Sequence, residues 1–219
     1  RLDALNPRTA GREMAAGRVS PPQAAVLLAA LLAVYLLSAR ALGHRCLVLS
    51  PVPIAVFTLY PLLKRVTWLC HAGVGLGLAL LPPAVWVAMK GTAAVPLAVA
   101  LFAGFVWAWG TGFDAIYGIL DIVSDRETGV KSFPARFGAR AAILFTAVMF
   151  GAAMAFLAGT VLCGKTTPLA AAGLAATAAV FAVELLLAAR GRIETAFFSV
   201  NSLAGLAAMA AVWFSAGAA

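Results

Sequence analysis

Residues 113–132, FDAIYGILDIVSDRETGVKS, carry acidic and aromatic side chains at helical spacing inside a long apolar stretch. Asp114, Tyr117, Asp121 and Asp125 follow one another at steps of three, four and four positions. An α-helix completes a turn in about 3.6 residues, so these steps place all four side chains on one face. At a rise of about 1.5 Å per residue, this face is about 16 Å long. The stretch therefore predicts a membrane helix that carries an acidic stripe, defined here as these four residues.

Carboxylates on this stripe need a physical reason, because charged side chains are costly in or near hydrocarbon. Stacked acidic groups also repel one another unless cations lie among them. Mg²⁺ prefers oxygen ligands, so the stripe predicts a Mg²⁺ site at the mouth of a membrane helix, shared with an anionic ligand. The simpler alternative is a helix end where Asp121 and Asp125 are solvated and pair with Arg126 or Lys131. This alternative suits Asp114 poorly, because that residue lies about two turns deeper.

The composition of the chain indicates a membrane protein with several spans. Its 219 residues are 63% hydrophobic and only 11% charged, with a mean hydropathy of +1.00. Soluble domains carry about 25% charged residues, so an ordinary soluble domain is excluded. The net charge of +8 does not predict nucleic-acid binding, because the basic residues form short clusters between apolar runs, as membrane loops do.

Seven apolar runs are long enough to cross a membrane. Pro51 and Pro53 are expected to interrupt the second run, which ends near Pro61. Pro82 is expected to kink the third run near Leu80. The chain is therefore expected to be all-α, a polytopic transmembrane helix bundle. The expected spans are residues 22–42, 46–62, 67–89, 94–121, 139–162, 167–188 and 195–215.

Lysine and arginine are distributed unevenly between the two sides of this expected bundle. Twelve of the 16 basic residues fall on the side of the N-terminal segment, which is therefore predicted to be cytoplasmic. All eight acidic residues also lie on or near that side, which predicts one polar pocket that opens to the cytoplasm. The four basic residues on the opposite side are Arg40, Arg45, Lys90 and Lys165.

Two basic clusters are expected on the same side as the acidic stripe. Asp3, Arg8 and Arg12 lie in an opening segment that contains proline and glycine. This segment is either a basic loop near anionic lipid headgroups or a diphosphate clamp, since guanidinium groups bind phosphate oxygens in pairs. Lys64 and Arg65 lie in YPLLKR at the end of the second run. They either fix the topology or, beside the acidic stripe, neutralise a leaving diphosphate.

Other polar residues in the apolar runs are given structural interpretations. His44 and His71 have no second ligand at metal spacing, so both are expected to be structural. Glu184 is either a functional group or a partner of Arg190. The three cysteines are too far apart for a metal site and are expected to be small buried hydrophobes; they are Cys46, Cys70 and Cys163.

Three separate elements, in the same order along the chain, resemble the UbiA superfamily of intramembrane aromatic prenyltransferases. Residues 2–20, LDALNPRTAGREMAAGRVS, resemble the end of the family's first aspartate-rich motif and the arginine-bearing loop after it. Residues 60–65, YPLLKR, resemble its tyrosine–basic element, and residues 113–138, FDAIYGILDIVSDRETGVKSFPARFG, resemble its second motif, D-x-x-x-D. NPRTAGR and KSFPARFG are most similar to the 4-hydroxybenzoate polyprenyltransferase branch, including relatives that serve menaquinone through the futalosine route.

The resemblance implies Mg²⁺-dependent transfer of a polyprenyl group from a polyprenyl diphosphate to an aromatic acceptor. The acceptor it implies is 4-hydroxybenzoate, in quinone biosynthesis of the ubiquinone or menaquinone type, with dihydroxynaphthoate or another aromatic compound as the alternative. It implies catalytic positions beside the allylic carbon for Asp114 and Tyr117. The implied Mg²⁺ ligands are Asp3, Asp121 and Asp125, and the implied diphosphate-binding residues are Arg8, Arg12, Lys64, Arg65 and Lys131.

Family members resembling this chain usually have about nine membrane spans, and the first motif ends the second of them. Asp3 matches the last aspartate of that motif. Residues 1–219 are therefore expected to form a single transmembrane prenyltransferase domain that lacks the first one to two helices. The resemblance implies an integral protein of the bacterial inner (cytoplasmic) membrane, in contact with lipid, with its active site facing the cytoplasm. It implies no particular oligomeric state.

Two other classes of membrane protein use acidic groups in comparable ways. A CDP-alcohol phosphatidyltransferase also has a D-x-x-x-D, but its pattern requires an upstream D-x-x-D-G-x-x-A-R, and nothing similar precedes Asp121. A cation-coupled transporter is expected to have two related halves, with charges near the bilayer midplane. The chain has no matching halves, and its charges lie toward one side.

Overall fold

The computed structural model describes residues 2–217, with side chains from residue 4 onward, and every regular element in this range is helical. Seven segments are long and apolar enough to cross a membrane, as the sequence predicts. Two short helices, α1 (Leu2–Leu5) and α9 (Phe133–Phe137), lie outside them. The spans are Pro21–Leu42 (α2), His44–Val66 (α3 and α4), Cys70–Lys90 (α5 and α6), Leu97–Thr128 (α7, η1 and α8), Ala139–Leu162 (α10), Pro168–Ala189 (α11) and Thr195–Ser215 (η2 and α12).

The second and third spans are each interrupted next to prolines. The second consists of α3 (His44–Leu49) and α4 (Pro51–Val66), and the third of α5 (Cys70–Ala79) and α6 (Leu81–Lys90). The prolines lie in the first turn of α4 and of α6, where the missing N–H costs no hydrogen bond. The predicted interruption of the third run near Leu80 is thus confirmed.

The predicted end of the second span at residue 62 is wrong. α4 continues through Pro61 to Val66, and the chain becomes extended only at Thr67, with φ −139° and ψ 147°. One proline removes a single hydrogen-bond donor, a loss that helices in apolar surroundings tolerate when local adjustments satisfy the freed carbonyl. The extra turn carries Lys64 and Arg65 to the end of the bundle.

The fourth span is not one regular helix. α7 (Leu97–Tyr117) passes into a 3₁₀ turn, η1 (Gly118–Asp121), and then into α8 (Ile122–Thr128). A 3₁₀ turn contains about 3.0 residues, so side chains after it no longer follow the helical register of α7. The expectation that Asp114 and Asp125 share one regular helical face is therefore wrong.

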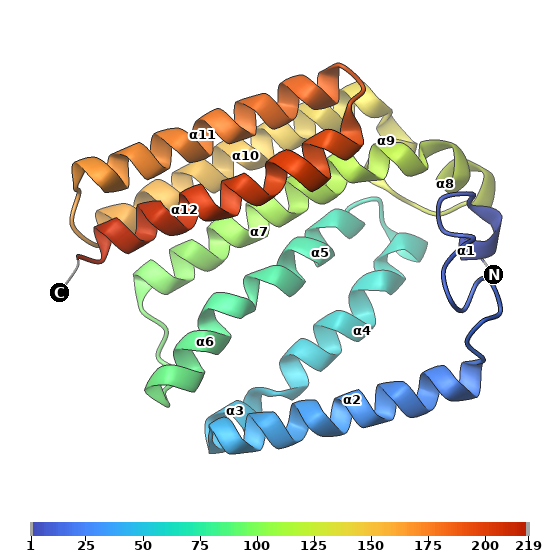
Figure 1. Ribbon diagram of the computed structural model, residues 1–219, viewed down its shortest axis with the longest axis horizontal. Coiled ribbons are helices and arrows are strands. Elements are labelled where there is room, and N and C mark those ends of the chain that lie inside the picture. Colours follow the sequence, from blue (N-terminus) through green and yellow to red (C-terminus); the bar gives the residue numbers. More distant parts are fainter. Residues whose placement is uncertain (1, 218–219) are drawn as a thin grey trace.

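α7 lies at the centre of the bundle and packs against both α5 and α10 (Figure 1). The core between α7, α10 and α11 is aromatic: Phe105 is buried, and the rings of Phe150 and Phe181 stack with centroids 4.0 Å apart. Thr146 on α10 donates a hydrogen bond of 2.9 Å to the carbonyl of Gly112 on α7. α7 is thereby fixed along its length, so its last turn is a firm base for the acidic residues.

α2 and α4 lie on the opposite side of the molecule from α10, α11 and α12 (Figure 1). α2 begins at a capping box, in which Ser20 and Gln23 each accept a hydrogen bond from the other's backbone N–H. Only Ala39 is buried on this helix, and large apolar residues such as Leu28 and Leu31 are exposed. Such an apolar surface is suited to contact with lipid or with further protein.

The three cysteines differ in their surroundings. Cys70 at the start of α5 is buried, as expected. Cys46 is half-buried and Cys163 is exposed, so the expectation of burial is wrong for Cys163. The reason is position: Cys163 follows the last residue of α10, where the chain turns toward α11.

Candidate functional site

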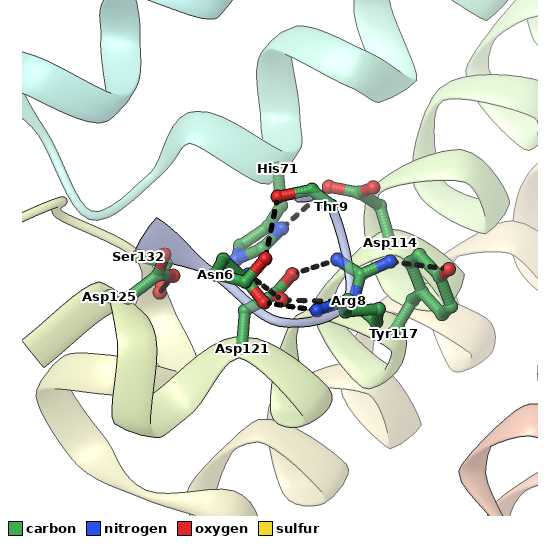
Figure 2. Close-up of polar contacts among 9 residues, drawn as sticks. All are labelled: Asn6, Arg8, Thr9, His71, Asp114, Tyr117, Asp121, Asp125 and Ser132. Carbon is green, nitrogen blue, oxygen red and sulfur yellow. Dashed lines mark hydrogen bonds and ion pairs between the residues drawn. The ribbon is translucent and has the colours of Figure 1, made fainter. Parts of the chain in front are cut away.

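The acidic residues lie at the end of the bundle where α7 stops. This end also holds the last turn of α4, the first turn of α5 and the N-terminal segment, whose helix α1 contacts α8 (Figure 1). Figure 2 shows the result: Asn6 and Arg8 reach the side chains of Tyr117 and Asp121. Segments more than 100 positions apart in sequence therefore form one polar cluster.

Arg8 is the centre of this cluster. Its Nε donates to Asp121 Oδ1 at 3.0 Å, and its Nη2 donates to Asp121 Oδ2, so the guanidinium binds the carboxylate in a bidentate manner. Its Nη1 donates to Tyr117 Oη at 2.6 Å, and its Cζ lies 4.7 Å from the centroid of the same ring. Asn6 Nδ2 adds a further donor to Asp121 Oδ1 at 2.8 Å.

The electrostatics of Arg8 suit an anion-binding group. Partial burial by itself would lower the pKa of Arg8, but the hydrogen bond and charge of Asp121, with a smaller effect of Tyr117, raise it above its ordinary value. The guanidinium is therefore a permanent cation. Because it already binds one oxyanion through a planar fork, it has the geometry to bind a phosphate in the same way.

Asp125 is held by a second set of contacts. Ser132 Oγ donates to Asp125 Oδ2 at 2.7 Å and also caps α9, accepting the N–H of Ala135 at 3.3 Å. Lys64 lies close enough to attract the carboxylate electrostatically. The backbone N–H of Lys131 donates to the carbonyl of Lys64 at 2.8 Å. The Lys131–Ser132 pair thus connects the end of α4 to α8, and it places Lys64 near Asp125.

Asp114 contacts a residue for which the sequence indicated only a structural role. Its Oδ2 lies 2.7 Å from His71 Nδ1, forming a hydrogen bond between α7 and α5 (Figure 2). The side chain of His71 is 3% exposed and that of Asp114 is 23% exposed. The pair joins positions 43 apart, which no local pattern reveals. The sequence contains only a weak indication of a functional role for His71, namely its position at the polar end of an apolar run, one turn before Gly75.

Tyr117 rests on an aromatic support from the last span. Its ring stacks on Phe197 with centroids 4.1 Å apart, and Phe198 meets it edge-on at 5.6 Å. Both phenylalanines belong to η2 (Thr195–Val200), a π-helical turn that runs directly into α12 (Asn201–Ser215). Such turns are frequent at functional sites. Sequence reasoning did not single out Phe197, because no linear pattern marks a π-helical turn.

Among the described side chains, the remaining predicted site residues lie at the same end of the bundle and are exposed. Lys64 and Arg65 are exposed on the last turn of α4, and Arg12 is exposed in the N-terminal segment. Lys131 is exposed as well, with its Nζ 3.5 Å from the carbonyl of Val66. The side chain of Asp3, predicted as a metal ligand, lies outside the described residues.

The donor chemistry of this end suits a hard divalent cation, since its acidic groups are carboxylates. Their arrangement is more open than a metal centre: within residues 4–217, no three His, Cys, Asp or Glu side chains come close enough to hold an ion. Asp121 faces Arg8, Asp125 faces Ser132, and Asp114 faces His71. The donors therefore fit Mg²⁺ in kind, while Asp121 is bound to Arg8 in this structure.

Glu184 on α11 is a separate acidic residue. It is fully buried, and neither carboxylate oxygen has a hydrogen-bond partner in the described part of the chain. Arg190, the partner considered from the sequence, is exposed beyond the end of α11 and does not pair with it.

An apolar cavity of about 410 Å³ lies at the other end of the bundle, between α2, α3, α4 and α6. Tyr35, Leu42, Pro83 and Val87 are among its lining residues. None of the acidic or basic residues of the polar cluster borders it. The cavity is therefore separate from the polar cluster.

The fold and the site together define an α-helical membrane protein with a polar cluster, centred on Arg8, where its central helix ends. Residues 1–209 match the UbiA prenyltransferase family, and the chain belongs to this family. The family and the all-α membrane fold expected from the sequence are thus confirmed.

Several relatives carry a more specific name. The chain is 35% identical to a 4-hydroxybenzoate octaprenyltransferase of Alkalilimnicola ehrlichii, over 91% of this chain and 68% of the relative. It is 32% identical to the mitochondrial 4-hydroxybenzoate polyprenyltransferase of Drosophila melanogaster, over 68% of this chain and 38% of the relative. It is 30% identical to a 4-hydroxybenzoate octaprenyltransferase of Pseudomonas putida, over 73% of this chain and 54% of the relative. The chain thus spans between about one third and two thirds of the length of these relatives.

A solved structure shares the fold. It is the apo structure of a UbiA homolog from Aeropyrum pernix K1, which superposes with a TM-score of 0.86 at 33% sequence identity. The match covers 97% of this chain and 79% of that chain. The chain therefore shares its helix arrangement with this UbiA homolog.

Proposed function

We propose that the protein transfers a polyprenyl group from a polyprenyl diphosphate to an aromatic acceptor, and that this acceptor is 4-hydroxybenzoate. The product would enter the biosynthesis of ubiquinone- or menaquinone-type quinones. Family membership and the names of the relatives support the reaction class. The observation that carries the proposal is the bidentate contact of Arg8 with Asp121, 113 positions away, beside Tyr117.

The reaction requires a leaving diphosphate and an allylic cation to be stabilised at the same time. The bond between the allylic carbon and the diphosphate oxygen breaks, and its electron pair leaves with the diphosphate. A ring carbon of the acceptor then forms a bond to the allylic carbon, and the ring gives up a proton to the released diphosphate. Fixed cations stabilise the leaving group electrostatically. We assign this role to Arg8, Arg12, Lys64, Arg65 and Lys131.

Asp114 and Tyr117 are assigned to the allylic carbon. Both lie on the last turn of α7, and their spacing of three positions puts them on one face. A carboxylate and an aromatic face both stabilise a nearby positive charge. The stack of Tyr117 on Phe197 holds the ring in place and adds apolar surface that keeps water from the cation.

We further propose that Asp3, Asp121 and Asp125 bind Mg²⁺. When bound, the ion supplies positive charge to the diphosphate oxygens. Asp121 and Asp125 would hold the ion through their carboxylate oxygens, and Arg8 would bind the diphosphate through its guanidinium.

The positions of the charges support a site that faces the cytoplasm from within a bacterial inner membrane. The cluster lies at the end of the bundle that holds most of the basic residues. Its substrates reach it from different phases: the prenyl tail from lipid, and the diphosphate and aromatic acid from the aqueous side. Excluding water from the pocket prevents hydrolysis of the allylic cation.

The test uses the complete protein in membranes, with labelled polyprenyl diphosphate and 4-hydroxybenzoate, in the presence of Mg²⁺ or a chelator. We expect prenylated 4-hydroxybenzoate to form only with Mg²⁺. If dihydroxynaphthoate is prenylated and 4-hydroxybenzoate is not, the protein is a prenyltransferase but the proposed acceptor is wrong. If diphosphate is released and no prenylated aromatic product forms, the proposed prenyl transfer is wrong.

A further inference from the structure

His71 is a buried histidine whose position is defined by contacts on three sides. Its Nδ1 bonds Asp114 at 2.7 Å, and its side chain is almost entirely enclosed, at 3% exposure. Asp114 retains 23% exposure, so its carboxylate is more accessible than the imidazole that it contacts. The imidazole therefore acts directly on a partly exposed carboxylate.

The packing of α5 against α7 fixes this pair. The two helices run in opposite directions, and one turn away from the pair Gly75 faces Gly110 and Thr111. A Cβ on Gly75 would collide with Thr111 Oγ1 and with the carbonyl of Trp107. This close approach sets the register in which position 71 lies opposite position 114.

The far side of the imidazole is closed by the backbone of η1. A Cβ on Gly118 would lie 3.0 Å from His71 Cε1 and 3.2 Å from Pro134 Cγ, so the ring packs against this glycine. The Nε2 atom is buried and has no hydrogen-bond partner among the described residues. An unpaired buried nitrogen destabilises the fold, so a purely structural role explains the residue poorly.

Resting on the function proposed above, we infer that His71 is a positioning residue for Asp114. Its hydrogen bond holds one carboxylate oxygen, which restricts Asp114 to one rotamer, and the side chain remains partly exposed. Asp114 is one turn from Tyr117, and both are assigned to the allylic carbon. A fixed carboxylate stabilises the developing cation without first having to reorient.

The kinetic test compares two substitutions of similar size in the complete protein. Asparagine places an amide N–H near the position of Nδ1, so His71→Asn keeps the donor, whereas His71→Leu removes it. The loss of a donor that fixes catalytic geometry costs about 10²-fold in rate. We expect His71→Leu to lose about this factor in kcat, with KM for the prenyl diphosphate within about threefold, and His71→Asn to recover most of it.

The matched control is His44→Leu, which removes an exposed histidine at the opposite end of the bundle and should leave kcat unchanged. Thermal unfolding in detergent is measured for each variant. If His71→Leu turns over like wild type, the inference is wrong. If His71→Leu and His71→Asn lose activity and stability equally, the role is structural and the inference is again wrong.

A second measurement does not depend on activity. With ¹⁵N-labelled histidine, the imidazole signals of His71 are assigned by their disappearance in His71→Asn. We expect Asp114→Asn to shift them and to leave those of His44 unchanged. Unshifted signals would overturn the inference even in an active enzyme. The His71 signals could shift in Asp114→Asn while the wild-type protein transfers no prenyl group to any aromatic acceptor. That result would contradict the proposed function and still support the contact between His71 and Asp114.

Discussion

Arg8 makes the most extensive set of contacts in the cluster, and its role depends on geometry as well as on charge. Both a carboxylate and a phosphate accept two parallel N–H donors from a guanidinium, whereas an ammonium offers only a point charge. The contact of Arg8 with Asp121 shows that this fork is already directed into the site. The residue is therefore suited to bind diphosphate once Asp121 is otherwise engaged.

Replacing this fork by a point charge tests the assignment. Hydrogen bonds to charged groups contribute about 1.5–3 kcal/mol, so Arg8→Lys should raise KM for the prenyl diphosphate by about 10- to 100-fold. The control is Arg18→Lys, because Arg18 pairs with Glu13 at an exposed position. An unchanged KM in Arg8→Lys would exclude Arg8 from diphosphate binding.

Ser132 has two roles, and they can be separated by experiment. Ser132→Ala removes the hydrogen bond to Asp125 and the cap of α9, which should cost about 0.5–2 kcal/mol of stability and also lower kcat. Ser20→Ala removes the cap of α2 far from Asp125 and should lower stability alone. Thermal unfolding and turnover are compared for both variants. Equal turnover in the two would show that the bond to Asp125 does not contribute.

At the residue scale, the sequence predicted the groups that are chemically unusual in a membrane. The aspartates on the fourth span stand out because charge there is costly. Arg8 and Lys64 stand out only when the acidic stripe is considered with them. His71 was missed because its meaning depends on Asp114, on another helix. Phe197 was missed because a phenylalanine in an apolar span is unremarkable until its stacking partner is known.

At the scale of elements, the main surprise is the 3₁₀ turn between α7 and α8. Helical periodicity alone placed the whole acidic stripe on one face, and this holds only up to Tyr117. Gly118 and the packing of His71 and Pro134 against it favour the tighter turn at this point. The turn directs Asp121 to Arg8 and Asp125 to Ser132, which a continuous helix would not do.

The contact between α5 and α7 depends on small residues at the crossing. Gly75→Ala adds a methyl group that collides with Thr111 and with the backbone of α7, and such overpacking costs about 1–3 kcal/mol. The variant should unfold at lower temperature in detergent and lose activity, because the pair of His71 and Asp114 is one turn away. Gly151→Ala is the control: nothing lies within 4 Å of a Cβ there, so it should unfold at or above the wild-type temperature. Equal unfolding temperatures would contradict the close packing.

At the scale of the whole molecule, the sequence predicted the number and the approximate limits of the spans. Hydropathy and length suffice for that purpose, because each span must satisfy its own backbone hydrogen bonds in lipid. Which helices touch was not predictable in the same way, since lipid-facing and protein-facing residues are both apolar. α7 became the central helix because of its glycines and aromatic residues, which pack closely with α5 and α10.

The orientation of the bundle can be tested with a native thiol. Cys163 is exposed at the end away from the polar cluster, so a membrane-impermeant maleimide should label it in cells whose inner membrane is intact. In a Cys46→Ser, Cys163→Ser background, Met14→Cys should react only after the membrane is permeabilised, because Met14 is exposed in the N-terminal segment that carries Arg8. The opposite pattern would place the polar cluster outside the cell membrane and contradict the proposed localisation.

The most direct test of the proposed site is the turnover of Asp121→Ala and Asp125→Ala in the complete protein, with polyprenyl diphosphate, 4-hydroxybenzoate and Mg²⁺. We predict that both variants remain folded in the membrane and form no detectable product, while the wild type does. If either variant transfers the prenyl group at the wild-type rate, these carboxylates do not bind the ion or the diphosphate, and the proposed site is wrong.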